Sequence, residues 1–347
     1  LNGCALFAPE PGIGRPVEWS DLTGWEQDRH SEAWPALLNG CEKLPSRDSS
    51  WREICAAAAA VATPDDQQVR LFFEQWFVPH DVFGGGVDHV GLITGYYEPR
   101  LHGSLEPDQR FRFPLYQRPG DLLTIDLHTL YPELKGKRVR GRLLGKRVVP
   151  YYERGQIDGD RSLLAGQELL WVDDPFALFF LHIQGSGQVE LPDGEVLAVG
   201  YADQNGHPYR SIGAELVRME ALDREQVNMF TIKRWLQDHP QQAEALVNRN
   251  ASYVFFTLKE DSRQAAVGSL NVPLTAERSI AVDREIIPLG VPVWLDTELP
   301  DDGAGSRYRR LVMAQDTGGA INGPVRADLF WGRGERAERM AGLMKQP

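Results

Sequence analysis

Apolar side chains recur at helical spacing near the start of the chain. One stripe follows the i, i+3, i+4, i+7, i+8 pattern of an amphipathic helix; its members are Val69, Phe72, Phe73, Trp76 and Phe77. Residues 63–66, Thr-Pro-Asp-Asp, have the proline and acids typical of a helix start. Ser50 and Glu53 have capping-box spacing and predict an alanine-rich helix before it. Residues 5–50 show no comparable period, so an irregular lead-in is expected.

Short apolar runs separated by Gly, Pro and Asp follow in residues 100–220. Runs of this length between turn residues predict strands; examples are 169–172, 178–181 and 189–191. The Asp-Gly pair at 193–194 is a hairpin signal. Helical spacing returns after Asp223, strands are expected again from Asn250, and a closing helix is expected from Gly332. The pattern therefore predicts a mainly β chain with several helices.

The charge balance limits the classes of partner. The chain of 347 residues carries a net charge of −12, which argues against a general nucleic-acid binder. The most basic stretch, residues 135–142, is interrupted by glycine and valine and predicts exposed strands and turns. An anionic partner for this stretch stays open. No run of about 18 apolar residues exists that could span a membrane.

Three cysteines bear on the compartment. Cys41 and Cys55 could pair in an oxidising periplasm, which would leave Cys4 unpaired. The opening Leu-Asn-Gly-Cys looks like the end of a bacterial lipoprotein signal, in which the cysteine is acylated after cleavage. The same letters recur at 38–41, where no signal is expected, so the position at the start favours Cys4. The alternative is three reduced thiols in a cytoplasmic protein.

Three aspartates near the C-terminal end are the candidate chemistry. Asp316 and Asp328 each lie at the margin of an apolar run, with a glycine-rich turn between them, and Asp283 ends the apolar run 279–282. Apolar flanks make a carboxylate harder to ionise, and an acid that keeps its proton near neutral pH needs such a setting. The alternative for Asp316 and Asp283 is that each caps a turn by accepting backbone N–H groups.

Four sequence blocks, taken together, resemble the membrane-bound lytic murein transglycosylase A family. They are Thr-Gly-Tyr-Tyr-Glu-Pro at 94–99, the stretch 179–187 continuing to 200–206, the stretch 250–256, and the three-aspartate segment, which resembles the family's "3D" domain. The blocks occur in the family's order and span most of residues 72–342. Ala251 departs from the pattern, which more often has proline, and this affects backbone stiffness rather than chemistry.

The resemblance implies a fold and a reaction. A double-psi β-barrel would form from residues 1–100 and 250–347, with a smaller β-rich barrel domain inserted as residues 101–249 and a substrate groove between the two. The β-1,4 bond between N-acetylmuramic acid and N-acetylglucosamine in peptidoglycan would be cleaved without water, because the muramic 6-hydroxyl attacks its own C1. One group then suffices as acid and later as base. The matching residue is Asp328.

The same resemblance assigns the other site residues and implies no cofactor. Asp316 would raise the pKa of Asp328 and position it, and Asp283 would support them. Amide, hydroxyl and aromatic groups suit a glycan strand; the candidates are Thr94, Tyr96, Tyr97, Gln184, Ser186, Gly187, Ser252 and Tyr253. The alternative is that the Gly-Ser-Gly at 185–187 is only a hairpin turn and that the tyrosines are core residues.

Other classes fit less well. The histidines have no zinc-site spacing, so no metal is expected, and His182 is expected to be structural. Asp-Thr-Gly at 316–318 looks like an aspartic protease motif, but those enzymes need two such aspartates. A peptidoglycan hydrolase or a non-catalytic peptidoglycan-binding protein remain the alternatives.

The expected cellular context follows from the resemblance and from Cys4. The chain is expected to be a lipoprotein at the periplasmic face of the outer membrane of a Gram-negative bacterium, since Ala5 follows Cys4 where aspartate would favour the inner membrane. Its expected partners are peptidoglycan glycan strands, the membrane through the lipid on Cys4, and cell-wall synthases or scaffold proteins, with no nucleic acid.

Overall fold

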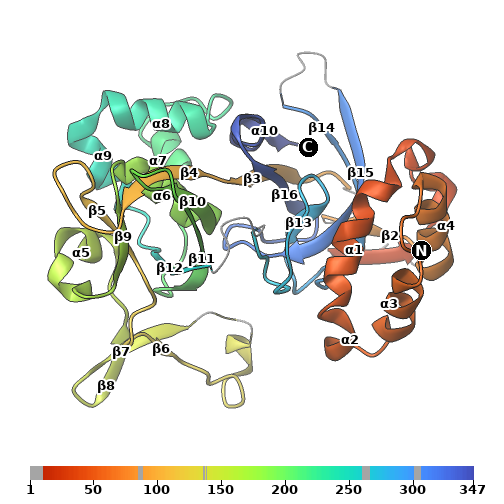
Figure 1. Cartoon of the computed structure of the whole chain (residues 1–347), viewed down its shortest axis with the longest axis horizontal. Coiled ribbons are helices and arrows are strands. Elements are labelled where there is room, and N and C mark those ends of the chain that lie inside the picture. Colours follow the sequence, from red (N-terminus) through yellow and green to blue (C-terminus); the bar gives the residue numbers. More distant parts are fainter. Residues whose placement is uncertain (1–10, 85–88, 136, 138, 260–265, 301–305) are drawn as a thin grey trace, which may run out of the picture. The chain divides into compact units, whose positions relative to one another are not determined.

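The chain folds into two compact units. The structure is a computed structural model that describes residues 11–84, 89–135, 137, 139–259, 266–300 and 306–347. The first unit combines both ends of the sequence, Leu1–Tyr97 and Ala265–Pro347, and the second is Glu98–Gln264 (Figure 1). Cys4, the predicted lipidation site, lies outside the described residues.

A six-stranded mixed sheet is the centre of the first unit, with strand order β14-β15-β13-β16-β3-β17. Its strands are β3 (Leu92–Glu98), β13 (Ser279–Val282), β14 (Pro292–Glu298), β15 (Arg307–Asp316), β16 (Arg326–Arg333) and β17 (Lys345–Gln346). Strand β13 pairs parallel to β15 and antiparallel to β16. All four residues of β13 are buried, as expected for a central strand covered on both faces. A separate two-stranded sheet joins β1 (Gly12–Pro16) to β2 (His80–Phe83).

Helices from the N-terminal segment pack on this unit. They are α1 (Trp34–Cys41), α2 (Leu44–Arg47), α3 (Trp51–Ala59) and α4 (Asp66–Trp76), with 3-10 turns at Trp19–Asp21, Trp25–Gln27 and His30–Ala33; α10 (Glu335–Leu343) follows β16. The expectation of an irregular lead-in at 5–50 is therefore wrong for α1 and α2. Cys41 and Cys55 form a disulfide that joins α1 to α3.

The predicted helix starts differ from the structure in detail. Ser50 precedes α3, but its side chain makes no capping bond; its backbone N–H donates to Asp48 Oδ1 instead. Helix α4 begins at Asp66, and Asp65 caps it by accepting from the Gln68 N–H at 2.8 Å. Val69 and Phe73 of the predicted stripe are fully buried, so the helical spacing itself is correct.

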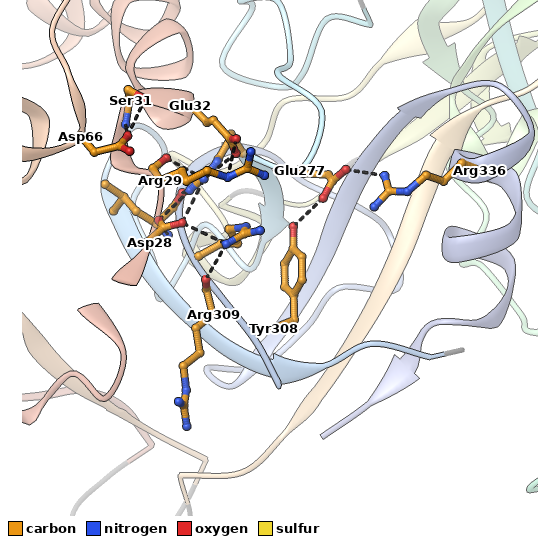
Figure 2. A network of polar contacts seen from close by, with 12 residues as sticks. Asp28, Arg29, Ser31, Glu32, Asp66, Glu277, Tyr308, Arg309 and Arg336 are labelled. Atoms are coloured by element: carbon orange, nitrogen blue, oxygen red, sulfur yellow. Dashed lines mark hydrogen bonds and ion pairs between the residues drawn. The ribbon is translucent and has the colours of Figure 1, made fainter. Parts of the chain in front are cut away.

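A buried ion-pair network fastens the N-terminal segment to the sheet. Arg278, immediately before β13, donates to both carboxylate oxygens of Asp28, at 2.7 and 3.0 Å, and to Glu32 at 2.8 Å. Figure 2 shows Asp28 and Glu32 in this network. Burial opposes the charge of Arg278, but its bonds to the two carboxylates raise its pKa. If Asp28 moved away, Arg278 would be left as a buried charge without its partner, which is costly. The network therefore holds the segment around Asp28 and Glu32 against the sheet.

The second unit has its own six-stranded mixed sheet, with strand order β12-β11-β10-β4-β9-β5, and a three-stranded sheet β6-β7-β8. The strands are β4 (Arg100–Ser104), β5 (Phe113–Tyr116), β6 (Leu123–Thr124), β7 (Arg140–Leu144), β8 (Arg147–Pro150), β9 (Glu168–Val172), β10 (Ser186–Glu190), β11 (Val196–Gln204) and β12 (Val254–Leu258). The helices are α5 (Arg154–Gly159), α6 (Pro175–Gln184), α7 (Ile212–Arg218), α8 (Met229–Asp238) and α9 (Pro240–Val247), with 3-10 turns at Pro132–Leu134 and Arg161–Leu164.

The prediction of a mainly β chain with several helices is confirmed, with two corrections in the second unit. Residues 178–181 lie in α6 rather than in a strand; Asp174 caps this helix and Pro175 begins it. The predicted boundary at 249 lies too early, because β12 is hydrogen-bonded to β11 and belongs to this unit. Within the described ranges, no helix is both long and apolar enough to cross a membrane.

Candidate active site

Two carboxyl groups lie on the strands that flank β13. Ala281 of β13 pairs with Asp316 of β15 on one side and with Asp328 of β16 on the other. Directly paired residues present their side chains to the same face of a sheet, and two strand spacings separate the two backbones by about 9–10 Å. Ala281, at the intervening position, is buried in an apolar cluster that includes Tyr96 and Phe330.

A shift in register brings Asp316 to this place. Ile280 pairs with Ala314, but the next residue, Ala281, pairs with Asp316, so Gln315 is an extra residue in β15. Gln315 is fully buried: it accepts from Ser279 Oγ at 2.6 Å and donates to the Ala36 carbonyl at 2.7 Å. Bulges of this kind re-aim side chains and are frequent beside active sites. The extra residue brings Asp316 into register with Ala281, on the face of the sheet that also carries Asp328.

Only one of the two carboxyl oxygens of Asp328 accepts a hydrogen bond from a described residue. Thr94 Oγ1 donates to its Oδ1 at 2.7 Å, and Oδ2 accepts no hydrogen bond from any described residue. Burial raises the pKa of Asp328 to about 6, and the nearby charge of Asp316 adds to this, while the Thr94 hydrogen bond and the charge of Arg326 oppose it. The residue still keeps some exposed surface. Asp328 can therefore hold a proton near neutral pH and present it to a ligand.

Asp316 is surrounded by donors. Its Oδ1 accepts from Ser269 N at 2.9 Å, Ser269 Oγ at 2.9 Å and Thr317 N at 2.8 Å, and its Oδ2 accepts from Tyr96 Oη at 2.9 Å. Burial raises the pKa of Asp316, and these four hydrogen bonds act against that rise. Donors to a carboxylate favour its ionised form. Asp316 is thus held as an acceptor, whereas Oδ2 of Asp328 accepts no bond from the residues that the structure describes.

Tyr96 and Thr94 reach the two aspartates from one strand. They are two residues apart in β3 and therefore share a face. The Tyr96 ring packs against Phe330 with centroids 5.2 Å apart. Burial and the charges of both aspartates raise the pKa of Tyr96 well above its usual value, so its hydroxyl stays protonated and acts as a donor.

Two other predicted residues of the first unit lie apart from this pair. Tyr97, on the opposite face of β3, donates from its hydroxyl to Glu338 of α10 at 3.1 Å. Asp283 accepts from the backbone N–H groups of Glu285 at 3.1 Å and Gly323 at 2.8 Å. Asp283 therefore does what a turn cap does, and it also ties its turn to the loop between Asp316 and Asp328.

The remaining predicted residues belong to the second unit. Gln184 ends α6, and Ser186 and Gly187 begin β10; a Cβ at Gly187 would come within 2.6 Å of Leu181 and 2.9 Å of the Pro99 carbonyl oxygen. Close packing thus accounts for this glycine. Ser252 and Tyr253 are buried, Tyr253 with 1% of its surface exposed. Both are placed as core residues, which was the alternative considered for the tyrosines.

Sequence reasoning missed three residues of the site: Ser269, Ala281 and Arg326. Ser269 lies 47 residues before Asp316, and nothing in its local pattern indicates this contact. Ala281 is defined only by register. Arg326 could have been found, because it precedes Asp328 by two residues in a strand and therefore shares its face. In the described part of the chain, no group of three or more His, Cys, Asp or Glu side chains could hold a metal ion.

Two neighbouring carboxyl groups whose surroundings shift their pKa values differently are typical of enzymes that use acid–base chemistry. Comparison with known proteins places this pair within a family. The model of the "3D domain" matches residues 278–347, which include both aspartates, and that of the "MltA specific insert domain" matches residues 92–257.

Relatives cover nearly the whole chain. The membrane-bound lytic murein transglycosylase A of Escherichia coli K12 is 32% identical, over 97% of this chain and 82% of its own length. The crystal structure of a membrane-bound lytic murein transglycosylase from Agrobacterium tumefaciens matches with a TM-score of 0.84 and 30% identity, covering 96% of this chain and 95% of that chain. E. coli MltA with bound chitohexaose matches with a TM-score of 0.66 and 25% identity, over 98% and 90% of the two chains. The chain belongs to the membrane-bound lytic murein transglycosylase A family.

Proposed function

We propose that the protein is a peptidoglycan lytic transglycosylase, in which Asp328 is the single general acid and base. The observation that carries this proposal is the Asp328 carboxyl group, whose pKa is raised to about 6 and whose Oδ2 accepts no bond from the described residues. Membership of a family named for this activity supports it, as does the E. coli relative's structure with bound chitohexaose, a sugar oligomer.

The reaction needs one proton to move twice. Asp328 donates its proton to the glycosidic oxygen, and the bond from that oxygen to C1 of N-acetylmuramic acid breaks. The 6-hydroxyl of the same sugar then attacks C1, and the Asp328 carboxylate takes the hydroxyl proton. The product is a 1,6-anhydro ring, and Asp328 is again protonated. No water is consumed, so a second carboxylate acting as base or nucleophile, as hydrolases need, is not required.

Asp316 serves this cycle as a fixed negative charge. Its four donors hold it in place and favour its ionised form against the burial that raises its pKa. A like charge nearby disfavours ionisation of Asp328, which keeps the acid loaded before cleavage. After proton transfer, the same charge makes the Asp328 carboxylate a stronger base. Thr94 and Tyr96 orient the two carboxyl groups, and Gln184 and Ser186 stay proposed as substrate-binding residues.

The cellular setting is proposed along the same lines. A membrane-bound name is shared by the relatives, and acylation of Cys4 would anchor the chain at the periplasmic face of the outer membrane. Incorporation of labelled palmitate by the wild type and its loss in Cys4→Ala would support this. Labelling that persists in the variant would contradict it.

The reaction is tested by mass spectrometry of muropeptides released from purified sacculi. The wild type is expected to release anhydro-muropeptides, lighter by one water than hydrolysis products, and Asp328→Asn is expected to release almost none. Reducing-end products would instead assign a hydrolase. If the protein bound to sacculi but released no product, it would be a non-catalytic peptidoglycan-binding protein.

A further inference from the structure

The three-stranded sheet of the second unit ends in a hairpin that the proposed reaction does not use. In its register Leu143 pairs with Val148 and Leu144 pairs with Arg147, across the two-residue turn Gly145-Lys146. Gly145 has a φ of 61°, as such turns require. Figure 1 shows β7 and β8 extending beyond the six-stranded sheet of this unit.

Apolar side chains on this hairpin are exposed. Residues 143–148 are all exposed, with 63% of Leu143, 49% of Leu144 and 50% of Val148 accessible. Three of the 17 large hydrophobic residues exposed in the described ranges are among these six residues of the hairpin. Single exposed apolar residues are ordinary on protein surfaces, but a cluster of them marks an interaction site.

The same segment is basic in an acidic protein. Residues 134–152 contain seven Lys and Arg and no Asp or Glu, although the chain has a net charge of −12. Arg140 is paired with Asp203 inside the unit, and Arg142 lies over the Tyr152 ring, 4.1 Å from its centroid. Lys146 and Arg147 at the tip are exposed and form no ion pair with any described residue. Their charge is directed to solvent.

We propose that the tip, residues 143–148, binds an anionic lipid surface. Apolar side chains that enter the interface together with cations that meet anionic headgroups are what such binding requires. Leu143 and its partner Val148 lie on one face of the hairpin. Leu144, the next residue along the strand, lies on the opposite face. A membrane interface surrounds a tip on both faces, whereas a glycan strand would meet the cations and leave the leucines in water.

Vesicle sedimentation tests this proposal with the full, unacylated chain, so that no lipid on Cys4 contributes. Vesicles of phosphatidylglycerol and phosphatidylethanolamine should sediment the wild type, and phosphatidylcholine vesicles should not. Leu143→Ser/Leu144→Ser should reduce binding about tenfold, from the loss of buried apolar surface. Arg147→Glu should reduce it at least about fivefold, the factor that corresponds to about 1 kcal/mol for one basic residue near such a surface.

Matched controls separate the hairpin from general surface effects. Leu105→Ser/Leu258→Ser removes two leucines exposed elsewhere in the same unit, 54% and 39% accessible, and Arg52→Glu changes an exposed arginine of α3. Neither control should change vesicle binding, and all variants should release anhydro-muropeptides from soluble glycan strands as the wild type does. The proposal is overturned if hairpin variants bind vesicles as the wild type does, or if they lose binding to sacculi rather than to lipid.

Discussion

Both units bury ionisable groups, but they do so with different consequences. In the second unit Arg154 is 2% exposed and donates to the carbonyl oxygens of Asn250 and Ser252, at 3.2 and 2.8 Å, and to His182 Nδ1 at 2.9 Å. Burial lowers the pKa of Arg154 and, well below its usual value, that of His182. Nε2 of His182 has no partner among the described residues, but it is fully buried.

Asp328 in the first unit combines a raised pKa with an oxygen that no described residue engages and with some exposed surface. Burial also shifts the pKa values of Arg154 and His182. Arg154, however, donates to two carbonyl groups and to His182 and pairs with Asp158, all within its own unit. A shifted pKa alone therefore marks burial. The site is marked by a shifted pKa together with an oxygen that accepts no bond from a described residue, on a side chain that keeps some exposed surface.

The largest expected effect is on activity, and it comes from replacing Asp328 in the first unit. Asp328→Asn should lower the rate of anhydro-muropeptide release by about 10²–10⁴-fold, the usual contribution of a general acid. Quantified chromatography of released muropeptides measures this. Asp283→Asn is a matched control, because that residue only accepts backbone N–H groups, and it should lose less than tenfold. Equal losses in both variants would contradict the assignment.

The second unit should respond in stability instead. Arg154→Met leaves two carbonyl groups and His182 without their donor, so it should lower the free energy of unfolding by about 3–5 kcal/mol. Denaturant titration monitored by circular dichroism measures the loss. At a temperature where the variant is folded, kcat for anhydro-product release should stay within about twofold of the wild type, since Arg154 contacts no residue of the aspartate pair. A large fall in kcat with unchanged stability would make this cluster part of the site.

A smaller effect is expected from Thr94→Val. The hydroxyl stabilises the ionised form of Asp328, so its removal should raise the pKa of that carboxyl group. With a higher pKa, Asp328 stays protonated to higher pH but is a weaker proton donor. Activity should therefore fall by no more than about tenfold, and the alkaline side of the pH profile should move to higher pH. Thr94→Ser, which keeps the hydroxyl, should restore the profile. A shift to lower pH would contradict this role.

The apolar flanks and the family resemblance singled out the aspartates, and the resemblance singled out the block that holds Thr94 and Tyr96. Sequence reasoning could not find the register shift at Gln315, which depends on a bond to the Ala36 carbonyl 279 residues away, or the contact from Ser269. The misassignment of 178–181 had a different cause. Asp174-Pro175 is a helix-start signal, but the short continuous apolar run after it fits a buried strand as well as a buried helix.

The pH dependence of kcat/KM for anhydro-muropeptide release, in the wild type and in Asp316→Asn, tests the central claim most directly. Asp328 must be protonated to begin the reaction, so the rate should be highest below its pKa of about 6 and fall about tenfold per pH unit above it. Removing the negative charge of Asp316 should move this midpoint to lower pH. A midpoint that stays in place in Asp316→Asn, or a rate that rises through pH 6, would contradict the account.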